Sequence, residues 1–132
     1  MENKTKDLQV VNESIERVNA MTDDQKADII AKAQLNTFDF PPKLKDLADG
    51  LSGTITSFEF SELVTFTNSK GIETEEYFLR FTTVNPDMDD VSIPVSTLKK
   101  QGISSEKVLT INYVGMEFTH TTGYGYEISE VK

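Results

Sequence analysis

The chain has 132 residues, a formal net charge of −9 and no cysteine. That length suits one domain with its own core, and the missing thiols exclude a disulfide framework, a zinc-thiolate site and thiol catalysis. Its first 30 residues are too polar for a signal peptide and no apolar run approaches a membrane span, so we expect a soluble protein of the cytoplasm, or of a particle assembled in a host cell.

Residues 1–50 predict two to three helices. Over residues 5–21, apolar side chains recur at steps of three and four, as on one face of an amphipathic helix. Residues 22–25, Thr-Asp-Asp-Gln, read as a capping box and start a second helix that runs to about Leu35. Pro41-Pro42 ends that helix and suits the first turn of a short third one. The apolar stripe either covers the rest of the fold or docks on a partner or a second copy.

Residues 51–132 predict short strands. A long strand over residues 54–67 changes the parity of its apolar side chains, which predicts a bulge near Ser57. A hairpin turn follows at residues 68–71, because Gly71 can take positive φ. The remaining expected elements are a returning strand around 77–81, a strand at 91–95, a helical turn at 96–101 closed by Gly102, and strands at 108–114, from 116 and at 124–131.

This order predicts an α+β fold that is mainly β. A twisted sheet of five to six antiparallel strands removes its edges by closing into a partly open barrel. A small antiparallel β-sandwich is the alternative. The helical segment 1–50 is expected to pack on or beside the barrel of residues 51–132, so that the whole is one compact domain.

Three segments resemble the OB-fold of single-stranded-DNA-binding proteins. They are Gly53-Thr54-Ile55 at the start of the long strand, residues 108–111 (Val-Leu-Thr-Ile) followed by Gly115, and residues 125–128 (Gly-Tyr-Glu-Ile) near the end. The resemblance spans residues 51–132 and implies an OB-like barrel. The chain departs from the family in its lack of tryptophan, its few basic residues and its C-terminus, which is not an acidic, Phe-ended tail. A phage-encoded variant would tolerate these departures best.

In that family, aromatic side chains stack on bases and basic side chains follow the phosphate backbone. Phe78 beside Arg80 would make a stacking platform if both point outward, although the first helix could instead cover them. Tyr124, set between two glycines, lies in the most site-like stretch, whose alternative is a plain turn. The resemblance implies a nucleic-acid-binding set of Phe58, Phe60, Phe78, Arg80, Lys70, Lys99, Lys100, Tyr124 and Tyr126.

The residues that could carry chemistry are sparse. His120 is the one histidine, and the sequence nominates no nucleophile or ligand partner for it. The loop with Asp87, Asp89 and Asp90 lacks the spacing of a calcium loop and is read as a solvated acidic loop. The run Glu73, Glu75 and Glu76 is likewise read as an exposed strand entry.

We therefore expect no catalytic residue, no metal and no cofactor, and hence a noncatalytic binding module. Its best single ligand is single-stranded nucleic acid, bound through an aromatic β-face. The net negative charge counts against phosphate binding, although a local basic patch can oppose it. The alternative is a structural or protein-protein interaction module, such as a phage or particle component, with self-association through the N-terminal helix as one form.

Overall fold

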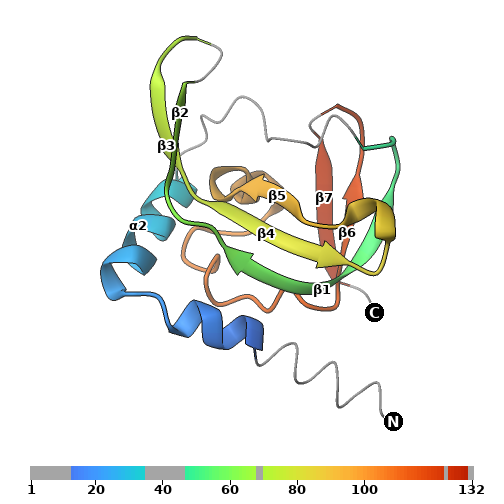
Figure 1. Cartoon of the computed structure of the whole chain (residues 1–132), viewed down its shortest axis with the longest axis horizontal. Helices are drawn as coiled ribbons and strands as arrows, with labels where there is room; N and C mark the ends of the chain where they lie inside the picture. Colours follow the sequence, from blue (N-terminus) through green and yellow to red (C-terminus); the bar gives the residue numbers. More distant parts are fainter. Residues whose placement is uncertain (1–12, 35–46, 68–69, 124, 131–132) are drawn as a thin grey trace.

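The computed structural model describes residues 13–34, 47–67, 70–123 and 125–130, and Figure 1 shows their arrangement. Most of the third helix expected after Pro42 lies outside these residues, as does the candidate site residue Tyr124, and residues 47–50, where that helix was expected to end, are not helical.

Helices cover one end of a β-structure. Residues 13–19 are helical, and α2 runs over Asp23–Gln34. The Thr22 hydroxyl accepts a hydrogen bond from the Gln25 N–H at 3.1 Å, which confirms the predicted start of this helix. Ile29 and Ala33 of α2 are buried. None of the helices in the described residues is long and apolar enough to cross a membrane.

The main sheet has five antiparallel strands in the order β5-β4-β1-β6-β7. The sheet curls into an OB-like half-barrel (Figure 1), so the predicted α+β, mainly β fold class is confirmed. A seven-residue 3-10 helix, η3 (Val95–Gln101), joins β5 to the segment before β6, and Gly102 ends it in the left-handed conformation with φ 85°. The strands are β1 (Ser52–Phe60), β4 (Phe78–Thr83), β5 (Val91–Pro94), β6 (Met116–His120) and β7 (Tyr126–Glu130).

The central strand β1 is shared between two neighbours. Its first residues pair with β6, where Gly53 faces Phe118, and its second half pairs with β4, where Phe58 faces Phe81. The register of the β1–β4 ladder shifts between Ile55 and Ser57, just beyond Thr54, the last residue that pairs with β6. The bulge predicted near Ser57 is therefore confirmed, and it bends the strand so that the sheet can curl.

A second, two-stranded sheet is inserted between β1 and β4. It is a hairpin of β2 (Val64–Thr67) and β3 (Glu73–Glu76), with Val64 opposite Glu76 and Thr67 opposite Glu73. The hairpin extends beyond the main sheet on the side of α2 (Figure 1). The single long strand expected at residues 54–67 is thus two strands. Residues 61–63 lie between them. Here the Ser61 hydroxyl accepts a hydrogen bond from the Phe78 N–H at 2.9 Å, and the Ser61 N–H donates to the Phe78 carbonyl at 2.8 Å.

The prediction of a strand at residues 108–114 is wrong, because this segment forms turns. The N–H groups of Thr110 and Ile111 both donate to the Lys107 carbonyl, at 2.9 and 3.2 Å, which closes a helical turn there. The Tyr113 hydroxyl donates back to the Val108 carbonyl at 2.8 Å, so the segment folds on itself. Its alternating apolar residues cover the core from an irregular turn instead of a strand.

One hydrophobic core links the helices to the barrel. Val18 from the first helix, Ile29 from α2 and Leu98 from η3 belong to the same buried cluster as Phe58 and Phe118 of the sheet. The Ser14 hydroxyl also accepts a hydrogen bond from the Phe58 N–H at 3.3 Å. The first helix therefore covers the edge of β1 that β6 leaves unpaired.

β1 approaches the end of β4 closely at Gly53, and a substitution there tests this approach. A Cβ at this position would lie 2.7 Å from Oγ1 of Thr83 and 2.9 Å from Cβ of Asn85. We expect Gly53→Ala to lower the free energy of unfolding in urea by about 1–3 kcal/mol, because neither neighbour can withdraw freely. The exposed neighbour Ser52→Ala is the control and should change little. Equal stability of both variants would show that the approach is looser than described.

Candidate functional site

The aromatic residues proposed for base stacking lie mostly in the core. Phe58, Phe78 and Tyr126 are only 2%, 7% and 6% exposed. Phe60 is half-buried, with its ring edge-to-face against Phe58 at a centroid distance of 6.4 Å. A base could not stack on the three buried rings unless the core opened. Tyr124 lies outside the described residues.

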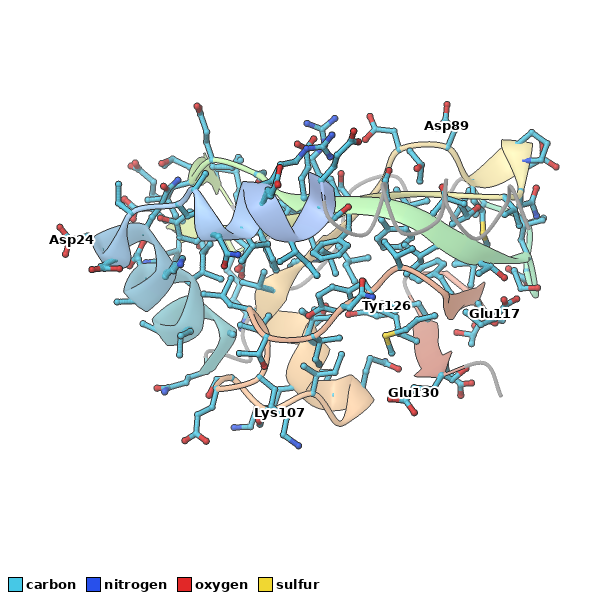
Figure 2. The ribbon with its side chains drawn as sticks, turned by 90° about the horizontal axis from the view of Figure 1, so that it is seen from below. Asp24, Asp89, Lys107, Glu117, Tyr126 and Glu130 are labelled. Atoms are coloured by element: carbon cyan, nitrogen blue, oxygen red, sulfur yellow. The ribbon has the colours of Figure 1, made fainter. Side chains whose placement is uncertain are left out.

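The buried rings form two groups within one hydrophobic core. Phe118 contacts Phe81 and Tyr126 at centroid distances of 4.9 and 5.5 Å, and Phe58 contacts Tyr113 at 5.0 Å. The Tyr126 hydroxyl is hydrogen bonded to the Thr97 hydroxyl, which ties β7 to η3. Burial raises the pKa of both Tyr113 and Tyr126 well above the usual range. Figure 2 shows Tyr126 inside the fold, while Asp24, Asp89 and Glu130 lie at its periphery.

The basic residues proposed for phosphate contacts are spread over separate elements. Arg80 lies on β4, where its guanidinium donates to both Asp90 oxygens at 2.9 and 3.0 Å. Lys99 and Lys100 are exposed in the last turn of η3, and Lys70 is exposed between β2 and β3. The Asp90 carboxylate largely offsets the Arg80 charge. The structure therefore does not gather these four residues beside the proposed aromatic rings.

The acidic loop after β4 is organised by its own hydrogen bonds. Pro86–Met88 forms a 3-10 turn, η2, and the Asn85 side chain accepts from the Asp87 N–H at 3.0 Å. Asp90 is engaged by Arg80. Within the part of the chain that the structure describes, no three His, Asp or Glu side chains are grouped to hold a metal ion.

His120 is a structural residue at the end of β6. Its side chain is fully buried, with Nδ1 2.9 Å from the Ala48 carbonyl oxygen and Nε2 2.9 Å from the Gly123 carbonyl oxygen. Both ring nitrogens are thus directed at backbone oxygens, which leaves neither for a substrate or a ligand. The ring joins the segment before β1 to the turn between β6 and β7.

A shallow groove of about 440 Å³ lies beside the end of β7. Its lining includes Ile111, Val114 and Met116, and among the described residues that line it Glu130 is the one ionisable side chain. A lone carboxylate offers neither an acid-base pair nor an activated nucleophile. The groove does not form a catalytic site from the residues that line it.

The β2–β3 hairpin is the surface that the sequence did not single out. Leu63 and Val64, at the root of the hairpin, are 37% and 39% exposed, and Ile72, beside its turn, is 59% exposed. Cross-strand pairing puts Glu73 and Glu75 on the face opposite to Val64, because Val64 pairs with Glu76. The sequence does contain apolar residues beside glutamates on both sides of the turn at Gly71. Whether those apolar residues are exposed depends on where the hairpin leaves the barrel, which the sequence alone does not show.

The Tyr126–Thr97 hydrogen bond can be tested by a double-mutant cycle. Tyr126→Phe should lower the free energy of unfolding by about 1–2 kcal/mol, because the buried Thr97 hydroxyl loses its partner on β7. Thr97→Val should cost more, since Thr97 also donates to the Pro94 carbonyl at 2.7 Å. In the double variant the two effects should not add. Additive effects in urea denaturation would mean that the two hydroxyls are not coupled.

No family model, no curated protein and no solved structure matches this chain. The resemblance to single-stranded-DNA-binding OB-fold proteins therefore stays a prediction. The functional argument depends on the geometry and charge of the chain's own surface.

Proposed function

We propose that this chain is a noncatalytic binding module that engages a protein partner through the β2–β3 hairpin. The observation that carries the proposal is a hairpin standing outside the main sheet with exposed apolar side chains (Figure 1). Two-stranded hairpins are marginally stable by themselves in water, and exposed apolar clusters mark interaction sites. A hairpin of this kind is therefore more stable when a partner covers its apolar side chains than when it is left exposed to solvent.

The apolar part of the surface supplies affinity. Leu63 and Val64 lie where the chain leaves β1 and enters β2, and Ile72 lies just before β3. Complete burial of a Val or Leu side chain contributes about 1.5–3 kcal/mol. Burial of the exposed parts of these side chains by a partner contributes part of the binding free energy.

The charges of the same hairpin define the partner. Glu62, Glu73 and Glu75 are exposed around it, and the whole chain carries a net charge of −9. Opposite charge on the partner speeds encounter and selects against acidic competitors. The partner is therefore a protein segment that combines basic and apolar side chains, as between neighbouring components of an assembled particle.

Binding of a short peptide with alternating Lys and Leu tests this surface. We expect fluorescence anisotropy to report binding to the unmodified chain, and Leu63→Ser or Val64→Ser to weaken it about tenfold or more, since each variant removes buried apolar area. A peptide with alternating Glu and Leu should not bind. Far-UV circular dichroism checks that the variants remain folded.

Val84→Ser is the matched control for these variants. Val84 is 64% exposed but lies after β4, away from the hairpin. This variant should bind the basic peptide as the unmodified chain does. If it weakens binding as much as Val64→Ser does, or if the acidic peptide binds equally well, the hairpin is not the recognition surface.

Single-stranded nucleic acid is the second candidate ligand. The observation that favours it is the OB-like strand order, in which the connections β1–β4 and β6–β7 correspond to loops that bind oligonucleotides in such barrels. Lys70 lies within the first of these connections. The acidic β3 and the Arg80–Asp90 pair oppose phosphate binding, so we rank this function second.

Titration with oligo-dT decides between the two candidates. Phosphate contacts would give an affinity that falls steeply between about 50 and 200 mM salt. In that case Lys70→Ala should reduce the slope of the logarithm of affinity against the logarithm of salt concentration. We expect no binding of oligo-dT at the lower salt concentration. Tight, salt-dependent binding of oligo-dT would contradict the proposed protein partner and favour nucleic acid as the ligand.

A further inference from the structure

Glu76 lies at the root of the hairpin and is buried. It is the last residue of β3, and after Tyr77 the chain enters β4 of the barrel. Its side chain is only 3% exposed, and it is the one carboxylate in the buried set of the described residues. The interpretation of residues 73–76 as an exposed strand entry is therefore wrong for Glu76. A carboxylate at the hinge between two sheets is excluded from water.

Polar groups of Tyr77 and Ser96 surround this carboxyl group. The Tyr77 N–H donates to Oε1 of Glu76 at 3.2 Å. The N–H and the hydroxyl of Ser96 in η3 lie against it and favour its ionised form. The Ser96 hydroxyl is buried and has no well-aligned hydrogen bond among the described residues. A protonated Glu76 could donate to that hydroxyl, whereas a carboxylate could only accept.

The nearby charges do not neutralise Glu76. Lys32 of α2 attracts it, but its ammonium group lies 3.7 Å from the exposed carboxylate of Glu75. Asp28, also on α2, is hydrogen bonded to the Tyr77 hydroxyl. Lys99 and Lys100 of η3 are exposed near the other end of that helix. The hinge thus has one cation shared between two carboxylates.

Burial is the dominant effect on this group. It raises the pKa of Glu76 from 4.5 to about 7, although Ser96, the Tyr77 N–H and Lys32 all act in the opposite direction. The neutral acid is therefore the stable form in the folded hinge below about pH 7. Above that pH the carboxylate must remain buried at a cost or leave for solvent.

We propose that Glu76 is a proton-controlled hinge that sets the freedom of the β2–β3 hairpin relative to the barrel. Neutral Glu76 stays under η3 and holds the hairpin in one orientation. Ionised Glu76 turns toward water, and because it ends β3, its departure loosens the root of the hairpin. The regulatory meaning of this hinge rests on the proposed function of the hairpin, but the motion itself needs no partner.

Spin labels can follow the hinge directly. The chain has no cysteine, so Thr65→Cys in β2 and Glu106→Cys on the barrel, both exposed, give a unique pair of labels. Electron-electron double resonance then measures the distribution of distances between them. We expect a narrow distribution at low pH and a broader one at pH 8, with the midpoint between the ordinary pKa of 4.5 and the value of about 7 for the buried group.

Two variants in the labelled chain identify the responsible group. Glu76→Gln should stay narrow at both pH values, because it keeps the shape of the neutral acid. Glu73→Gln removes an exposed glutamate from the same strand and should respond as the parent does. A distribution in the parent that is independent of pH would overturn the proposal, as would a response that persists in Glu76→Gln or disappears in Glu73→Gln.

The spin-label and peptide-binding experiments test the proposed hinge and the proposed function separately. The labels report without any ligand, so a pH response combined with no peptide binding would reject the protein-partner function alone. Peptide binding combined with a rigid hairpin would reject the hinge alone. Should Glu76→Gln fail to fold, a parent distribution that is independent of pH still overturns the hinge.

Discussion

The fold depends on one strand that serves two neighbours. β1 pairs with β6 over Ser52–Thr54 and with β4 from Ile55 onward, and its ladder with β4 contains the bulge between Ile55 and Ser57. Because the strand bends next to the point where it passes from one partner to the other, the two halves of the sheet turn toward each other and enclose a core. Phe58 and Phe118, from the two halves, are both buried in it. The same closure removes the sheet's rings from the surface, and the inserted hairpin becomes the exposed projection of the fold.

Much of this architecture could be predicted from local patterns. The change of apolar parity around Ser57 required a bulge, since a strand cannot otherwise keep one face buried. Gly71 and Gly102 marked a turn and a helix end, and both adopt the positive φ that favours glycine. The fold class followed from these signals. They are properties of neighbouring residues, so no knowledge of long-range packing was needed.

What could not be predicted depends on contacts between distant residues. Alternation shows which side chains share a face but not what covers that face, so it does not reveal that Phe58 and Tyr126 are buried. Residues 108–114 alternate like a strand but are held in a turn by the Lys107 carbonyl. Local sequence does not distinguish Glu76 from the exposed Glu73 and Glu75. It is buried because η3, which comes later in the chain, packs against it. These differences moved the candidate site from an aromatic face to the hairpin.

The central claim is that the aromatic rings form the core and are not a recognition surface. A spectrophotometric titration of the four tyrosines tests it most directly. Burial and the Asp28 carboxylate raise the pKa of Tyr77 to about 12, and burial raises those of Tyr113 and Tyr126 further. The account predicts that at most one tyrosine ionises near pH 10 while the chain remains folded. Reversible ionisation of three or four tyrosines near that pH would contradict it.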